Sequence, residues 1–326
     1  MTPVTTLNKT ALRRGTSLIS FTGLVPPPKI MRPNGISAVT MARNEEDWLE
    51  LSVQSIIDSV DEVVLADHGS DDSTPELATH LAGKYPDKIR VVDLHGLDFV
   101  PAINLMLGKT RYRWILRWHA DFVAHTSGPN SIQALRRRVL AVSSAKHFCA
   151  SLSGVALDGD LEHQYRERRD PPEPFLYTYS PWLRYYQRLH WEGLHVPWFY
   201  ARITWPEVYY FHMRRVKSSI RLLQTIYWSR WFDERVRNSQ VTLREFIETH
   251  ATRDYGSRSV EEAARKAMLE YFSGCLLFSR DECGDYPDLL KPLIRNPPYR
   301  LVYRGGTLVD RVEPNRPIQP KQWILA

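Results

Sequence analysis

Short apolar runs alternate with amphipathic stretches along the chain from Gly35 onward, and this alternation constrains the fold more than any other feature. Apolar runs bounded by turn-forming residues are typical of buried strands, whereas the longer stretches between them have the spacing of helices with one apolar face. Strands that alternate with helices predict a mostly parallel sheet sandwiched by helices, which is an α/β fold. The predicted strands cover residues 36–41, 62–66, 89–94 and 113–118, and the predicted helices cover residues 45–60, 73–84 and 101–108.

The composition is that of a folded protein with many aromatic side chains. Hydrophobic residues make up 43% of the 326 residues and charged residues 25%, so the chain can bury a sizeable core and is not mainly disordered. Its 10 Trp, 16 Tyr and 11 Phe are concentrated after residue 174, which predicts a second half suited to stacking and contact surfaces as well as core packing. The length fits two domains or one large α/β domain with an appendage.

The charge and the cysteines indicate the kind of partner and the cellular compartment. A formal net charge of +6 favours acidic partners such as phosphates, anionic lipid or nucleic acid. Three widely spaced cysteines, Cys149, Cys275 and Cys283, fit neither a disulfide framework nor a zinc signature. No apolar run approaches the roughly 18 residues of a membrane-spanning helix, and the N-terminus lacks the apolar core of a signal peptide. We expect a cytoplasmic protein that is soluble or peripheral at the inner face of a membrane.

The rest of the chain divides into segments of different texture. Residues 1–32 are rich in Thr, Ser and Pro and are predicted to form a flexible leader. Residues 158–212 mix Pro, aromatic residues, Arg and His with little periodicity. Helices are predicted over residues 214–237, 242–249, 260–272 and 286–293, and extended surface structure over residues 296–326.

Polar segments follow three of the predicted strands. They are residues 43–46, 67–72 and 119–121. In an open α/β sheet the ligand site forms outside the carboxyl ends of the strands. We therefore expect these segments to meet around a ligand.

Asp67 stands at the end of the second predicted strand and permits two interpretations. Its carboxylate suits hydrogen bonds from a base N–H or from ribose hydroxyls. Alternatively, it belongs to a plain turn through Gly69 and Asp72, after which Ser73 or Thr74 caps a helix.

His119 and Asp121 are two candidate metal ligands, two residues apart on the same side of an extended chain. A carboxylate together with diphosphate oxygens and water suits Mg²⁺, and the imidazole shifts the preference towards Mn²⁺. By alternation, Arg117 points to the same face as His119; it is equally well interpreted as an arginine at the surface or core edge.

Taken in order, four motifs resemble the donor-binding half of glycosyltransferase family 2, which has the GT-A fold. They are the strand 36–41 followed by Asn44-Glu45-Glu46, the segment from Asp67 to Thr74, Asn104 in a helical stretch, and the segment from Trp114 to Asp121. The resemblance covers roughly residues 35–125. It implies a metal-assisted enzyme of hexosyltransferase type that moves a sugar from a nucleoside diphosphate donor, expected to be a UDP-sugar, to a glycan or lipid-linked acceptor.

The resemblance also assigns roles to individual residues. Asn44 and Glu45 would lie against the nucleotide, and Asp67 would contact its base or ribose. The Asp-x-Asp motif of the family aligns with His119, Ala120 and Asp121, with His119 in place of the first Asp. The residues implied for donor binding are Asn44, Glu45, Asp67, Ser70, Asn104, Arg117 and His195, and those implied for Mg²⁺ or Mn²⁺ are His119, Asp121 and His212.

The second half is expected to bind the acceptor and to provide the base for an inverting displacement. The segment from Arg184 to His195 resembles the strand and turn of the family before a Gly-x-x-His motif, and Glu192 is its nearest carboxylate. His195 and His212 each have a structural interpretation besides a ligand role. The rivals of Glu192 for the base are Asp158, Asp160, Asp170 and Glu173.

These assignments predict a GT-A catalytic domain over residues 33–212, with a donor half over 33–125 and an acceptor half over 126–212, followed by a helical, aromatic-rich extension over 213–326. The basic and aromatic helix 214–237 fits contact with anionic lipid, packing on the catalytic domain, or nucleic-acid binding. The expected setting is synthesis of a cell-envelope polysaccharide or glycolipid. The alternative functions are a catalytically inactive nucleotide-binding module and a basic nucleic-acid-binding protein.

Overall fold

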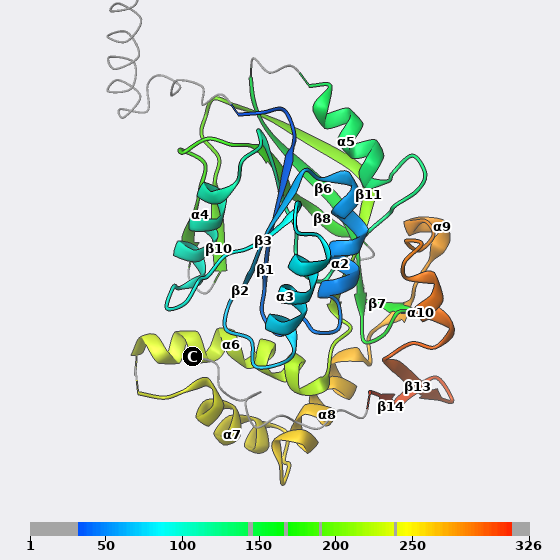
Figure 1. Cartoon of the computed structure of the whole chain (residues 1–326). Coiled ribbons are helices and arrows are strands. Elements are labelled where there is room, and N and C mark those ends of the chain that lie inside the picture. The colour runs from blue at the N-terminus through cyan, green and yellow to red at the C-terminus, as the bar shows by residue number, and fades with distance from the viewer. Residues whose placement is uncertain (1–31, 143–145, 166–168, 189–190, 238–239, 315–326) are drawn as a thin grey trace, which may run out of the picture.

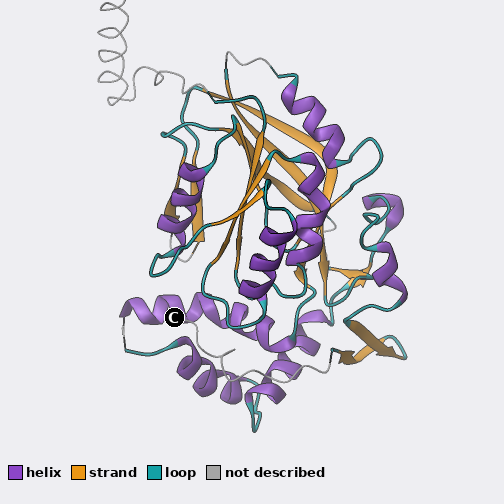
Figure 2. Cartoon of the chain, viewed as in Figure 1, coloured by secondary structure: helices purple, strands orange, loops and turns teal. Residues whose placement is uncertain are grey.

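An eight-stranded mixed sheet forms the centre of the molecule (Figures 1 and 2). The structure is a computed structural model that describes residues 32–142, 146–165, 169–188, 191–237 and 240–314. The predicted leader lies outside these residues except for Arg32. The strands of the sheet are β1 (Ile36–Ala42), β2 (Glu62–Asp67), β3 (Ile89–Val91), β4 (Trp114–Arg117), β5 (Phe122–Ala124), β6 (His147–Asp158), β8 (Asp170–Thr178) and β11 (Tyr200–Arg215).

The strand order is β3-β2-β1-β4-β8-β6-β11-β5. Strands β3, β2, β1 and β4 run parallel, and β11 runs parallel to β6. Strand β8 is antiparallel to both β4 and β6, and β5 is antiparallel to β11. The sheet is therefore mostly parallel, which confirms the predicted fold class.

Helices cover both faces of the sheet. On one face, α2 (Leu49–Ile56), α3 (Thr74–Lys84) and α5 (Ile132–Leu140) pack against alternate side chains of β1, β2 and β4. On the other face lie α4 (Phe99–Lys109) and the hairpin of β9 (Arg184–Arg188) and β10 (Trp191–His195). Because both faces are covered, the central strands are buried over almost their whole length and are rich in apolar residues.

Three further helices form a second core at the carboxyl ends of β1 and β2. They are α6 (Ser219–Arg237), α7 (Leu243–Asp254) and α8 (Val260–Phe272), and Figure 1 shows α6 crossing below these strands. Tyr227, Trp231, Phe246 and Phe272 are buried in this core. The helical, aromatic-rich C-terminal region is thus confirmed. The buried aromatic residues of α6 pack against α7 and α8, so this face of the helix is used by the second core.

Short elements complete the chain around this core. They are the 3₁₀ turn η1 (Ile57–Ser59), β7 (His163–Gln164), β12 (Leu276–Leu277), α9 (Arg280–Cys283), α10 (Lys291–Arg295), β13 (Arg300–Arg304) and β14 (Thr307–Val312). The cysteines Cys149, Cys275 and Cys283 are all buried, and none forms a disulfide within the described ranges. Among the residues that the structure describes, no helix is both long and apolar enough to cross a membrane.

Residues 158–212 show little periodicity in the sequence, so the pattern predicts no strand or helix there. The structure corrects this. These residues include β8 to β11, and β11 is the longest strand of the sheet. Its pairing with β6 shifts register between Trp205 and Val208 and again between Val208 and Tyr210. Each irregularity changes which side chains face the core, so the period of two is hidden in the sequence.

The predicted boundaries of the C-terminal elements also need correction. The helix expected from residue 214 begins at Ser219, because Arg214 and Arg215 still belong to β11, where Arg215 pairs with Asp158. The helix expected over 286–293 is the shorter α10, Lys291–Arg295. The expected extended tail contains the hairpin β13–β14, whose turn uses Gly305 and Gly306 at φ 57° and 80°. Residues 315–326 of that tail lie outside the described residues.

Gly154 gives a direct test of the packing between β6 and β11. A Cβ atom at Gly154 would overlap the ring of Tyr210 on β11, whereas Gly83 in α3 has open space around it. We predict that Gly154→Ala lowers the free energy of unfolding by about 1–3 kcal/mol through overpacking. Gly83→Ala should leave it unchanged or raise it by up to about 1 kcal/mol. Urea denaturation of both variants checks this, and equal stabilities would contradict the packing described.

Candidate functional site

The loops after β1 and β2 are joined by hydrogen bonds between side chains and backbone. The Asn44 N–H donates to Ser70 Oγ at 2.8 Å, and the Asp71 N–H donates to Asn44 Oδ1 at 2.9 Å. The Glu45 N–H donates to Thr74 Oγ1 at 2.8 Å. Asn44 has a positive φ of 53°, a conformation that Asn tolerates better than most residues. The two loops therefore form one rigid rim at the carboxyl edge of the sheet.

The two oxygens of Asp67 have different environments. Oδ2 accepts hydrogen bonds from the N–H groups of Gly69 and Ser70, both at 3.1 Å, which is the turn predicted from the sequence. Oδ1 is buried and has no hydrogen-bond partner among the described residues. A buried acceptor without a partner is costly unless a ligand satisfies it. The turn interpretation and the ligand interpretation of Asp67 are thus compatible.

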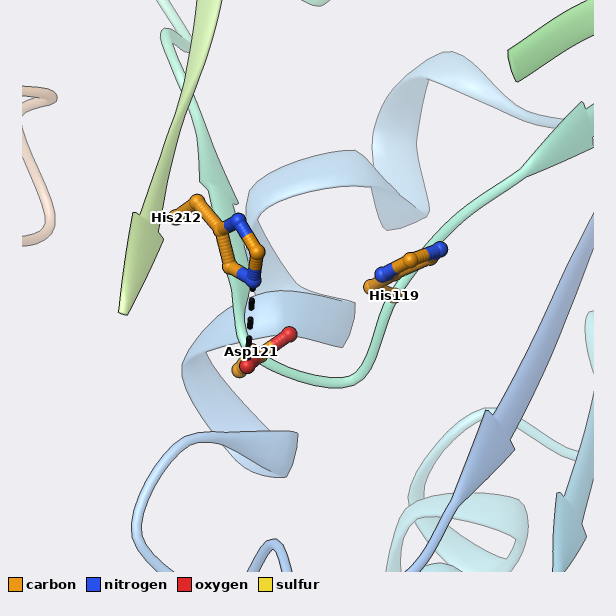
Figure 3. A group of neighbouring side chains, drawn as sticks. All are labelled: His119, Asp121 and His212. Carbon is orange, nitrogen blue, oxygen red and sulfur yellow. Dashed lines mark ion pairs between the residues drawn. The ribbon is translucent and has the colours of Figure 1, made fainter. Parts of the chain in front are cut away.

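His119, Asp121 and His212 form a cluster beside this rim. One ligand atom from each residue lies within 4.8 Å of the others, and the three side chains converge in Figure 3. His119 and Asp121 lie in the turn between β4 and β5, and His212 lies on β11, which pairs with β5. The antiparallel pairing of His212 with Phe122 brings ligands from residues far apart in sequence to one point.

Stacked aromatic rings hold His119 in place. Its ring stacks on Phe122 with centroids 4.6 Å apart, and Phe122 stacks in turn on Tyr210 at 4.1 Å. Phe175 contacts His119 edge-on at 5.2 Å. Burial, reinforced by the nearby Arg117, holds the pKa of His119 well below its usual range. His119 is therefore neutral at pH 7 and offers a nitrogen lone pair.

The other two members of the cluster are charged. Burial would raise the pKa of Asp121, but Lys217 and His212 hold it well below its ordinary value. Burial would lower the pKa of His212, but Asp121 and Asp170 raise it to about 9. His212 Nε2 lies 3.4 Å from Asp121 Oδ2, and its Nδ1 lies 3.0 Å from Asp170 Oδ2. The second contact orients the ring so that Nε2 faces the cluster.

Two cations from the start of the C-terminal region reach the same place. Lys217 Nζ donates to Asp121 Oδ2 at 2.8 Å and to Glu45 Oε1 at 2.6 Å. Arg221 donates to the backbone oxygen of Arg43 at 2.9 Å. Burial, aided by Arg221, lowers the pKa of Arg43 to about 10. The Nε groups of both arginines are buried without a partner in the described part of the chain, which leaves donors available to an anion.

A cavity of about 550 Å³ opens between the rim and the C-terminal region. The rim contributes Asn44, Glu45 and Asp71 to its lining, and α6 with the residues before it contributes Lys217 and Arg221. Within the described ranges, neither Asp67 nor Asp121 lines the cavity itself. They lie directly behind its wall, Asp67 in the turn that holds the rim and Asp121 behind Lys217.

Lys217, Arg221 and Arg43 were missed by the sequence interpretation. Arg43 lies in the predicted polar segment 43–46, and Lys217 and Arg221 lie in the basic helix 214–237, for which the sequence left three interpretations open. The signal for Lys217 was its position five residues after His212, close to the edge that β11 shares with β5. Lys217 can be placed near this edge only once β11 is known to extend to Arg215.

The structure places the remaining predicted site residues at varied distances from the cluster. Asn104 is fully used by the backbone of Tyr185, since its Nδ2 donates to the Tyr185 oxygen and its Oδ1 accepts from the Tyr185 N–H, both at 2.9 Å. Arg117 is buried, and its NH1 has no partner among the described residues. His195 is exposed at the end of β10 and lies outside the metal-like cluster of the described residues.

The candidate bases differ in how their carboxylates are used. Asp158 is fully buried and pairs with Arg214 and Arg215, at 3.5 and 2.9 Å. Asp160 accepts from His163 and from the Leu301 N–H, both at 2.8 Å. Both carboxylates therefore serve the structure.

The other candidates lie closer to the cluster. Asp170 orients His212. Glu173 and Glu192 interact electrostatically with each other, and Glu173 also with Arg117 and His212. Burial, followed by the charge of Asp170, raises the pKa of Glu173.

Comparison with known proteins agrees with this architecture. The model of the family described as Glycosyl transferase family 2 matches residues 37–135. This range contains the rim, Asp67, His119 and Asp121. The match supports the resemblance of the four motifs to this family over residues 37–135, which is less than half of the chain. No curated protein matches the chain.

Several solved structures are similar to the chain over part or most of its length. A mannosyltransferase from Pyrobaculum calidifontis in complex with GDP-Man and Mn²⁺ has 15% sequence identity and a TM-score of 0.39, with 89% of each chain covered. S. aureus TarS 1-349 in complex with UDP-GlcNAc has 13% identity and a TM-score of 0.38, covering 86% of this chain and 98% of that one. Glucosyl-3-phosphoglycerate synthase from Mycobacterium tuberculosis, with Mn²⁺, UDP and its product, has 21% identity and a TM-score of 0.27, covering 37% and 44%.

The two bonds between Asn104 and Tyr185 predict a structural role for Asn104. We expect Asn104→Ala to lower the free energy of unfolding by roughly 1–3 kcal/mol and to speed tryptic cleavage after Arg184 and Arg188, because the β9–β10 hairpin loses its anchor on α4. Asn34→Ala, which removes a single exposed bond to the Leu140 oxygen, is the matched control. Lost affinity for nucleoside diphosphates with an intact hairpin would instead support a donor-binding role.

Proposed function

We propose that the protein transfers a sugar from a nucleoside diphosphate donor, expected to be a UDP-sugar, to a hydroxyl group of a glycan or lipid-linked acceptor. The observation that carries this proposal is the position of the His119, Asp121 and His212 cluster beside a cavity whose lining includes Lys217 and Arg221 and comes from both the region that matches the family 2 model and the segment after β11. A leaving diphosphate needs positive charge at the point where its own charge develops. A hexosyltransferase-type donor site requires this combination.

The proposed donor site uses the rim for the nucleoside and the cations for the diphosphate. The unpartnered Oδ1 of Asp67 is proposed to accept a hydrogen bond from the base or the ribose. Asn44, Glu45 and Ser70 hold the rim against which the nucleotide would lie. Arg221 and Lys217 line the cavity and would face the phosphate oxygens. The cavity volume of about 550 Å³ lies within the range of ligand pockets, roughly 300–1,000 Å³.

The cluster fits a divalent cation such as Mn²⁺ or Mg²⁺. His119 is held neutral by burial and Asp121 is held ionised. His212 directs Nε2 at Asp121 and would bind a cation after releasing the proton that Asp121 and Asp170 stabilise. One carboxylate and two imidazoles suit Mn²⁺ better than Mg²⁺. When bound, the cation supplies Lewis-acid stabilisation of the negative charge on the leaving diphosphate.

The acceptor side of the site is proposed to lie towards the β9–β10 hairpin. Glu192 on β10 is the proposed base that removes the proton from the acceptor hydroxyl in an inverting displacement. The raised pKa of Glu173 reflects burial and nearby carboxylates, so Glu173 carries the proton more readily than an isolated glutamate. In this arrangement the sheet domain, residues 33–212, would bind both substrates, and residues 213–326 would close the donor side. A cell-envelope polysaccharide or glycolipid is the proposed product.

Donor binding is tested by the thermal shift of the full chain with nucleoside diphosphates, with and without Mn²⁺. We expect UDP with Mn²⁺ to raise the melting temperature most. Asp67→Asn should weaken UDP binding about tenfold or more, because a charged acceptor is lost. Asp121→Asn should remove the effect of Mn²⁺. Asp87→Asn, an exposed carboxylate at the opposite, amino edge of the sheet, is the control and should behave like the wild type.

Turnover of a UDP-sugar by the same variants separates the proposal from its competitors. Glu192→Gln should retain UDP affinity and lose about 10²–10⁴-fold in turnover if it is the base. Binding without turnover under Mg²⁺ and Mn²⁺ would favour an inactive nucleotide-binding module. Affinity for nucleic acid that falls steeply with salt, with no affinity for UDP, would favour a nucleic-acid-binding protein.

A further inference from the structure

Lys217 lies between the cavity and the cluster of His119, Asp121 and His212. Its side chain is 12% exposed, its Nζ donates to Asp121 Oδ2 at 2.8 Å, and the same residue lines the cavity. His212 Nε2 approaches the same oxygen at 3.4 Å. The charge of Asp121 is therefore compensated in this structure by the ammonium group of Lys217 together with His212.

Two cations compete for one carboxylate at this position. An ammonium group and a divalent cation are both strongly attracted to the Asp121 carboxylate, and they repel each other at the short separation that shared binding requires. Burial makes this repulsion stronger than it would be in water. A divalent cation on Asp121 and the Lys217 ammonium group at 2.8 Å are thus alternative arrangements.

We propose that Lys217 and the divalent cation are alternative counter-ions of Asp121. Lys217 neutralises the carboxylate until the cation takes its place. It then remains on Glu45, where Nζ already donates to Oε1 at 2.6 Å, and faces the cavity. This inference rests on the proposed function, because it takes the cluster to be the metal site.

The backbone around Lys217 is fixed, so the exchange needs movement of the side chain alone. Trp48 Nε1 donates to the Val216 oxygen at 2.7 Å, and Arg311 donates to the Lys217 oxygen at 2.8 Å. The Ser219 N–H donates to Glu313 at 3.0 Å. The flexible four-carbon stem of lysine allows its ammonium group to leave Asp121 while these bonds stay in place.

Lys217 is expected to lower the affinity of the cluster for a cation added alone. We expect the displaced ammonium group to gain a favourable partner when a diphosphate enters the cavity that it lines. Cation and diphosphate would therefore strengthen each other's binding, and by linkage the effect is the same in either order. Removing the charge of Lys217 should strengthen the binding of the cation alone.

Mn²⁺ titration of the full chain, without any donor, tests this directly, with free Mn²⁺ measured by electron paramagnetic resonance. Lys217→Met should bind Mn²⁺ about tenfold more tightly than the wild type, within the usual range of coupling between two binding events. Lys217→Arg keeps the charge and should not bind more tightly. Lys84→Met, which removes an exposed lysine paired with Glu50, is the matched control and should equal the wild type. Asp121→Asn should abolish binding.

The outcomes distinguish this inference from the proposed function. Equal or weaker Mn²⁺ binding by Lys217→Met, with binding lost in Asp121→Asn, overturns the competition but leaves the metal site standing. An absence of Mn²⁺ binding in every variant, or binding that does not depend on Asp121, overturns both. The thermal-shift experiment with UDP tests the proposed donor site independently of the Mn²⁺ titration.

A measurement on the wild type covers the case in which Lys217→Met does not fold. Acetic anhydride labels lysine side chains, and mass spectrometry reports the reactivity of each one. Saturating Mn²⁺ should increase labelling of Lys217 several-fold, because its ammonium group is released from Asp121 and faces the cavity, while labelling of Lys84 should not change. Unchanged labelling of Lys217 under saturating Mn²⁺ would overturn the inference.

Discussion

The ionised carboxylate of Asp121 is the constraint on which the arrangement of the site depends. A buried carboxylate is stable only when opposite charge and hydrogen bonds surround it. Here the compensation comes from Lys217 and His212, which belong to parts of the chain about ninety residues further on. The charge of Asp121 therefore connects three parts of the molecule through its ion pairs: the sheet, the end of β11 and the start of the C-terminal region.

This tie explains why the C-terminal helices close the carboxyl edge of the sheet. Strand β11 runs beside β6 as far as Arg215, and Lys217 follows within two residues. Helix α6 then starts at Ser219 directly below the rim, where Arg221 meets the backbone of Arg43. Ligand chemistry at the rim and packing of the helical region are thus coupled through a short segment. Under the proposed function, a donor molecule in the cavity would contact both.

Local sequence patterns predict the fold of residues 33–125 well, because the strands and helices there are short, regular and close in sequence. The turn at Asp67 and the pair of His119 and Asp121 follow strand ends, so the rule on carboxyl edges is enough to locate them. The second half is harder to predict. Register shifts in β11 hide its alternation, and the pairing of His212 with Phe122 joins residues ninety positions apart.

The role of Lys217 depends on that long-range pairing, and no local pattern contains it. Asn104 shows the opposite case, since a motif residue is fully used by the backbone of a distant strand. The most direct test of the central claim is a crystal structure of the protein with Mn²⁺ and UDP, in which anomalous scattering locates the manganese. The account predicts an anomalous peak bonded to Asp121 and His119, with the diphosphate in the cavity and Lys217 no longer on Asp121. Manganese bound elsewhere, with the Lys217 and Asp121 pair intact and UDP outside the cavity, would contradict it.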